Sequence, residues 1–169
     1  PDWTSSNSLS SYGIEIGDIN MDGNLDLVVG NNNNNLELYL NTGSTLEASP
    51  SWVMLEQNDT RDIAIGDIDG DGDLDLAVAN HGNPNSVFIN QMTTSGYTYD
   101  QGPSWTSSNT LNSHGVAWAD IDGDGDEDLA VANYQGEPEI YSSTGATLSS
   151  TDTWSNSVTV VVGDIIIWT

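Results

Sequence analysis

The stretch IGDIDGDGDLDLAVAN (65–80) places five aspartates within nine positions and then continues into alternating apolar residues. The same alternation precedes the aspartates in DIAIGD (62–67). Alternation at a period of two is typical of strands, and clustered Asp and Gly residues are typical of turns. The stretch therefore predicts two strands joined by a short, strongly acidic loop.

This pattern is repeated along the chain. Residues 3–31, 52–80 and 105–133 align without a gap, and each segment runs from a tryptophan through an acidic loop to an alternating strand. The first aspartates of the three loops, Asp18, Asp67 and Asp120, lie 49 and 53 residues apart. A fourth unit begins as WSNSVTVVVGDIIIWT (154–169) and lacks the acidic loop. Repeats of this length indicate a repeat architecture rather than one irregular domain.

Each repeat has room for four strands. Besides the two that flank the acidic loop, we expect a third strand in 36–41, 86–90 and 138–143 and a fourth around each repeat tryptophan. Four antiparallel strands per unit are typical of a β-propeller blade. We predict an all-β fold, a single propeller domain over residues 1–169, with repeats at 3–51, 52–104 and 105–153 and a partial repeat at 154–169. Because three blades are too few for a ring, we expect the chain termini, including paired strands in 158–168, or a neighbouring subunit to complete it.

The acidic loops carry oxygen ligands at a fixed spacing. Counting the first aspartate as position 1, side-chain oxygens fall at positions 1, 3, 5 and 9, and a glycine at position 6 permits the turn. Position 7 would contribute its backbone carbonyl. Oxygen ligands without His or Cys favour Ca²⁺, so we predict three calcium sites. Their residues are Asp18, Asn20, Asp22, Asn24 and Asp26; Asp67, Asp69, Asp71, Asp73 and Asp75; and Asp120, Asp122, Asp124, Asp126 and Asp128.

These loops are not EF-hands, since position 12 is a valine within a strand instead of a bidentate glutamate. The chain resembles the FG-GAP, or VCBS-type, repeat family of integrin α-subunit propellers and secreted microbial proteins, whose blades carry a D-x-[DN]-x-D-G-x-x-D calcium loop. The resemblance covers residues 3 to about 154. It implies metal-ligand roles for the residues at positions 1, 3, 5, 7 and 9, but none for Asp164 in the fourth unit.

Charge and composition limit the partners. The net charge is −25 and Arg61 is the only lysine or arginine, which excludes nucleic acid as a partner and disfavours an anionic membrane surface. No apolar run is long enough to insert into a membrane. The recurring tryptophans, Trp3, Trp52, Trp105 and Trp154, fit packing between blades better than sugar binding, and Trp118 fits the core.

Catalysis has little support in the sequence. His81 and His114 have no nearby nucleophile motif, so we interpret them as turn or surface residues. Metal-bound carboxylates are held ionised, and the other acids form no distinct constellation. We therefore expect a non-enzymatic, extracellular, calcium-stabilised structural or adhesive module that forms a homo-oligomer or filament through its terminal strands and contacts a glycan or surface protein. A calcium-dependent lectin is the alternative, and a fragment of a secreted hydrolase is the third reading.

Overall fold

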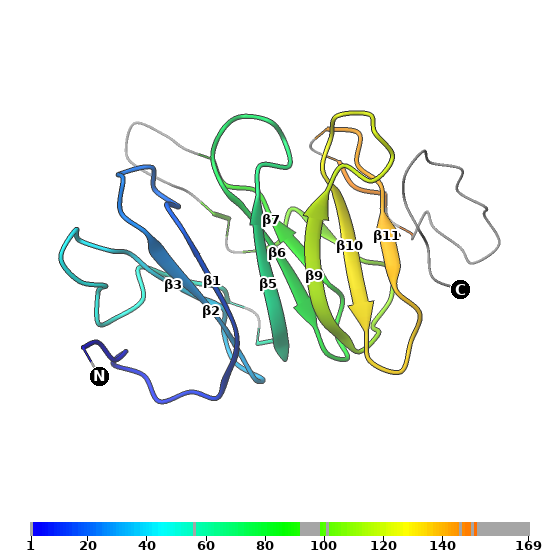
Figure 1. Ribbon diagram of the computed structural model, residues 1–169. Coiled ribbons are helices and arrows are strands. Elements are labelled where there is room, and N and C mark those ends of the chain that lie inside the picture. The colour runs from blue at the N-terminus through cyan, green and yellow to red at the C-terminus, as the bar shows by residue number, and fades with distance from the viewer. Residues whose placement is uncertain are drawn as a thin grey trace.

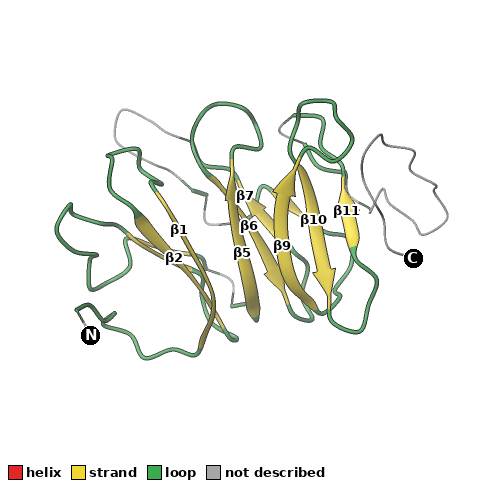
Figure 2. Cartoon of the chain, in the orientation of Figure 1, coloured by secondary structure: helices red, strands yellow, loops and turns green. Residues whose placement is uncertain are grey.

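The computed structural model describes residues 2–55, 57–91, 99–100, 102–145, 147–149 and 151, and these residues form three antiparallel sheets without helices (Figures 1 and 2). Within these ranges no helix is long and apolar enough to cross a membrane. The first sheet consists of β1 (Ser11–Gly17), β2 (Asp26–Asn31), β3 (Glu37–Tyr39) and β4 (Trp52–Val53). The second consists of β5 (Thr60–Gly66), β6 (Asp75–Asn80), β7 (Ser86–Phe88) and β8 (Trp105–Thr106), and the third of β9 (Ser113–Ala119), β10 (Asp128–Asn133) and β11 (Glu139–Tyr141).

The all-β prediction is confirmed, and the strands flanking each acidic loop lie where the alternation indicates. The third strands are shorter than expected, at three residues each. Trp52 and Trp105 begin the predicted fourth strands, β4 and β8. Each of these strands pairs with the third strand of the preceding repeat and so completes the sheet of that repeat. Trp154 and the predicted strands in 158–168 lie outside the described residues.

The strand predicted around Trp3 is wrong. Residues 2–10 contain no strand. A strand at a repeat tryptophan pairs with the third strand of the repeat before it, and no described sheet precedes the first one. Trp3 nevertheless packs edge-on against Tyr39, with ring centroids 5.3 Å apart.

The sheets follow one another along their first strands, so that β1, β5 and β9 lie side by side (Figure 1). At Gly13 of β1 an added Cβ would lie 3.0 Å from the Asp62 Cα of β5, so the backbones of these strands are in close contact. The Val116 N–H of β9 donates to Asp62 Oδ2 at 3.1 Å. Glycine and a short side chain therefore allow the first strands to approach closely.

The hydrophobic cores lie between successive sheets. One core joins Val28 and Leu38 of the first sheet to Ile63 and Leu76 of the second. The other core joins the second sheet to Leu129 and Val131 of the third and is flanked by Trp118.

The predicted packing of tryptophans between sheets is confirmed at both junctions. Trp52 contacts Phe88 of the next sheet edge-on at 5.7 Å, and Trp105 contacts Tyr141 in the same way at 5.0 Å. Edge-to-face pairs of this kind add stabilisation beyond the burial of their surface. The aromatic pairs therefore fasten each sheet to its successor.

Each first strand also contains a β-bulge at the same place. The pairing register shifts between residues 11 and 13, 60 and 62, and 113 and 115, so that Tyr12, Arg61 and His114 are the bulged residues. A bulge bends the strand and redirects the side chain of the extra residue. These three residues lie at the end of the first strands opposite the acidic loops.

Candidate metal centres

All three acidic loops lie at the same end of the sheets, where the first strands end (Figure 1). Each loop turns through positive φ at positions 4 and 6. Position 6 is glycine in all three loops, as predicted, with φ of 90°, 94° and 101° at Gly23, Gly72 and Gly125. Position 4 is glycine in the second and third loops but Met21, with φ of 56°, in the first. Because side chains disfavour this conformation, the first loop is the more strained one.

Backbone hydrogen bonds fix the aspartates at the odd positions. In every loop the position 6 N–H donates to the position 1 carboxylate, from Gly23, Gly72 and Gly125 at 2.8, 3.0 and 3.2 Å. The position 5 N–H donates to the side chain at position 3, and the position 7 N–H donates to the carboxylate at position 5. The loop backbone thus orients the side chains at positions 1, 3 and 5.

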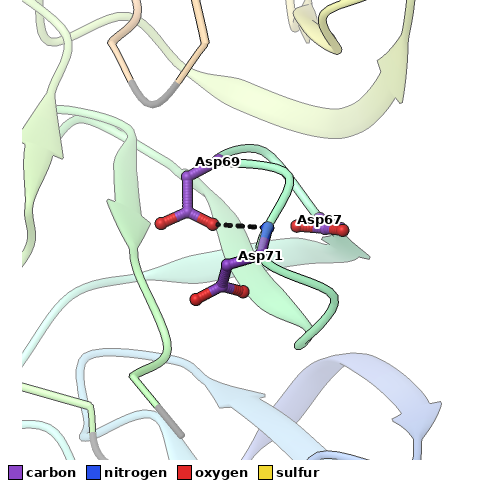
Figure 3. Close-up of side chains that lie close together, drawn as sticks. All are labelled: Asp67, Asp69 and Asp71. Carbon is purple, nitrogen blue, oxygen red and sulfur yellow. Dashed lines mark hydrogen bonds between the residues drawn. The ribbon is translucent and has the colours of Figure 1, made fainter.

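The carboxylates at positions 1, 3 and 5 converge in two of the loops. One oxygen from each of Asp67, Asp69 and Asp71 lies within 4.8 Å of the others, as Figure 3 illustrates for this loop. Asp120, Asp122 and Asp124 form the equivalent cluster in the third loop. In the first loop the amide of Asn20 occupies position 3 and donates to Asp22 Oδ2 at 3.1 Å. The first loop therefore carries one fewer carboxylate at these positions.

The aspartate at position 9 is fully buried in every loop and accepts two backbone hydrogen bonds. One donor is the N–H at position 2 of the same loop, and the other is an N–H that follows the third strand. For Asp75 these donors are Ile68 at 2.9 Å and Asn90 at 2.7 Å. Asp26 and Asp128 accept the equivalent pairs. Position 9 therefore ties the loop to the outer part of its sheet, and its role as a metal ligand stays a prediction, as does that of the position 7 carbonyl.

In the second loop, burial and neighbouring charges disfavour the ionised form of two aspartates. Burial raises the pKa of Asp75 to about 7, since two hydrogen bonds do not fully offset its desolvation. Burial also raises the pKa of Asp69, and the charges of Asp71 and Asp67 add to the effect. In the first loop the pKa of Asp22 is lowered, mainly by the Asn24 N–H, whereas burial raises the pKa of Asp26. In the third loop desolvation raises the pKa of Asp122.

The donor set fits a hard divalent cation. Asp67 Oδ1 is buried and has no hydrogen-bond partner, although Oδ2 of the same side chain accepts from Gly72. A buried carboxylate oxygen without a partner is costly unless a cation or a donor satisfies it. The converging groups are all carboxylate oxygens, which suit Ca²⁺ or Mg²⁺ and not a thiophilic metal.

Two contacts between loops were not evident from the sequence. Asn90, which follows β7, donates through Nδ2 to the Ile19 carbonyl of the first loop at 3.1 Å. Glu127 of the third loop reaches the second loop: an added Cβ at Gly66 would lie 2.6 Å from Glu127 Oε2. Burial raises the pKa of Glu127, and the charge of Asp67 adds to this. The first and third acidic loops are therefore each in contact with the second sheet.

The comparison with protein families agrees with this geometry. The family described as FG-GAP-like repeat matches residues 18–78 and 67–131. The chain belongs to the FG-GAP-like repeat family. Each match begins at the first aspartate of one loop and ends in the strand after the next loop, so the FG-GAP-like repeats of this chain are defined by the acidic loops. A comparison with curated proteins found no match.

Proposed function

We propose that this FG-GAP-like repeat chain is a calcium-binding β-propeller module with a structural or adhesive role outside the cell. The observation that carries the proposal is the cluster of converging carboxylates in the second and third loops. The first loop has the same hydrogen-bonded turn with Asn20 at position 3. Ca²⁺ accepts six to eight oxygen ligands in flexible geometry, whereas Mg²⁺ requires a tighter octahedron. Extracellular modules typically bind Ca²⁺ with dissociation constants of about 10⁻⁴ to 10⁻³ M, which suits the calcium concentration outside cells.

The proposal is tested by removing calcium. The ionised aspartates of each loop repel one another, so chelation is expected to lower the melting temperature or to unfold the chain, and Ca²⁺ to restore it more effectively than Mg²⁺. Calorimetric titration should count three sites. An unchanged melting curve in excess chelator at low salt would contradict the proposal.

The propeller is supported by the way the sheets succeed one another. In each sheet the first strand forms one edge and the third strand, joined by a fourth in the first two sheets, lies towards the other, and the cores between sheets use equivalent residues. The outward face of the first sheet leaves Ile14 and Ile16 exposed by 60% and 53%, whereas their equivalents in the second sheet, Ile63 and Ile65, are 2% exposed and half-buried in the first core. Within the described residues no sheet packs on this face, which has the composition of a sheet junction.

The outward face of the third sheet corresponds to that of the first sheet, at the other end of the series of sheets. Its hollow of about 450 Å³ includes Ala130, Ala132 and Ile140, and Ala130 and Ile140 are equivalent to core residues Ala77 and Val87 of the second sheet. We propose that a second copy of the chain supplies the missing neighbour, head to tail, in a closed ring or a filament. The mass of the protein in solution with and without Ca²⁺ tests this: a monomer at all concentrations and in both conditions would exclude the assembly.

We further propose that the module is not an enzyme. Glu37 and Glu139, two acids outside the loops, are buried and accept hydrogen bonds from Tyr39 and Tyr141, so they are poorly suited to proton transfer with a substrate. A glycan array with and without Ca²⁺ distinguishes the adhesive role from a calcium-dependent lectin. Turnover of a polysaccharide would instead revive the hydrolase reading.

A further inference from the structure

The two histidines of the chain meet at the junction of the second and third sheets, far from the acidic loops. His81 follows β6 and His114 lies in β9, and His81 Nδ1 is 2.9 Å from His114 Nε2. Their rings are 5.1 Å apart and tilted by 46°. His114 is near the start of β9 while Asp120 follows its end, so the pair lies about 20 Å from the third acidic loop.

Both side chains are held by the fold. His114 is the bulged residue of β9, and its ring stacks on Tyr134 at 5.2 Å with an interplanar angle of 12°. The His81 N–H donates to the Asp59 carbonyl at 2.8 Å, and His81 forms a β-bridge with Asn112. The bulge is present in all three sheets, but only here does it bring an imidazole towards a second one. Bulges that redirect a side chain are commonly features of functional sites.

We propose that His81 and His114 form a two-imidazole site for a late first-row transition-metal ion such as Cu²⁺ or Ni²⁺, separate from the hard-cation loops. Imidazole nitrogen is a preferred ligand of these ions, and tetragonal coordination by nitrogen and oxygen is typical of Cu²⁺ and Ni²⁺. Two nitrogens at about 2.1 Å from one ion and at right angles are about 3.0 Å apart, whereas tetrahedral coordination separates them by about 3.4 Å. The observed 2.9 Å is that of a hydrogen bond between the two rings, and it also matches the right-angled spacing, so a metal ion would take the place of the shared proton.

Access and charge favour such an ion. His114 is exposed and His81 is half-buried, so water can complete the coordination sphere. The net charge of −25 raises the local concentration of cations around the molecule. Because the two ligands come from different sheets, the bound ion would join the second sheet to the third.

The test is Cu²⁺ binding to the full chain with its acidic loops first saturated with Ca²⁺. Electron paramagnetic resonance at one equivalent of Cu²⁺ is expected to show coupling to two imidazole nitrogens. The chain has only these two histidines and no cysteine, so the imidazole signal reports this pair alone. His81→Asn and His114→Asn should each leave one nitrogen and weaken Cu²⁺ binding by about tenfold or more, and the double variant should leave none.

Two comparisons make the outcome decisive. Asp71→Asn and Asp124→Asn should keep the nitrogen coupling, since they alter only the acidic loops. Cu²⁺ should raise the melting temperature of the wild-type chain but not that of the double histidine variant. Equal Cu²⁺ binding by wild type and double variant, or a spectrum without imidazole coupling, would overturn the proposal and leave the two histidines as a hydrogen-bonded pair.

Discussion

Gly66 ends β5 at the point where the third sheet packs against the second. A Cβ added there would lie 2.6 Å from Trp118 Cδ1, 3.0 Å from Trp118 Cγ and 2.6 Å from Glu127 Oε2. Real Cβ atoms do not approach other atoms this closely, so Gly66→Ala must displace the Trp118 ring, which belongs to the core at this junction. Forcing extra volume into a packed interface costs about 1 to 3 kcal/mol. We expect Gly66→Ala to lie in the upper half of that range because the obstructing group is a rigid ring.

Two further glycines calibrate this expectation. Gly17 is the equivalent residue of the first sheet, and its added Cβ would meet the tip of Ile65, a flexible side chain that can change rotamer. Gly17→Ala should therefore cost about 1 kcal/mol, the lower end of the same range. Gly102 has no atom within 4 Å of an added Cβ, so Gly102→Ala should be neutral or slightly stabilising.

The assay is urea unfolding at saturating Ca²⁺, followed by tryptophan fluorescence and by circular dichroism. The expected order of destabilisation is Gly66→Ala, then Gly17→Ala, then Gly102→Ala. If Gly66→Ala were as stable as Gly102→Ala, the close packing of the third sheet on Gly66 would be refuted.

Three other predictions concern the acidic loops. The first loop should bind Ca²⁺ most weakly because Asn20 replaces a carboxylate. In calorimetric titrations of Asp22→Ala, Asp71→Ala and Asp124→Ala, the weakest binding transition should disappear only in Asp22→Ala. Its disappearance in either of the other two variants would contradict this. Met21→Gly should raise the stability of the chain by up to about 1 kcal/mol because it removes a side chain from positive φ. The reverse change at the equivalent position, Gly70→Met, should lower the stability by about 1 to 2 kcal/mol. Equal chemical denaturation curves for both variants would count against the strain. Asn90→Ser should lower the stability of the chain by about 1 to 3 kcal/mol because the Ile19 carbonyl loses a buried donor. The same variant should reduce any cooperativity between the first two calcium sites. Calorimetric curves identical to those of the wild type would show that this hydrogen bond carries no coupling.

Features local to one repeat could be predicted from the sequence. The period of the tryptophans and aspartates located the strands beside each loop, and the glycine at position 6 indicated the turn. The convergence of Asp67, Asp69 and Asp71 follows from their spacing on that turn. These features depend on neighbours within a few residues, which is why a single sequence contains them.

The packing of the repeat tryptophans between sheets was predicted, but other contacts between two sheets could not be. His81 and His114 are 33 residues apart, and their contact requires both the sheet junction and the bulge in β9. The approach of Glu127 to the second loop arises in the same way. The sequence also suggested a strand at Trp3, because the repeat carries no mark of whether a partner strand precedes it. Contacts between sheets join residues that lie far apart in the sequence, so the sequence alone does not indicate which of these side chains meet.

The fourth strand of a sheet is encoded at the beginning of the following repeat, since β4 and β8 start at Trp52 and Trp105. The first residues of a repeat therefore form the last strand of the sheet before it, and the last strand of its own sheet comes from the repeat that follows. A single repeat excised at its tryptophan would lack one strand and carry another that belongs elsewhere. Selection for which repeats can stand next to each other must then act on the tryptophan segment of the later repeat. A change in the order of the repeats would therefore pair each tryptophan segment with a different third strand.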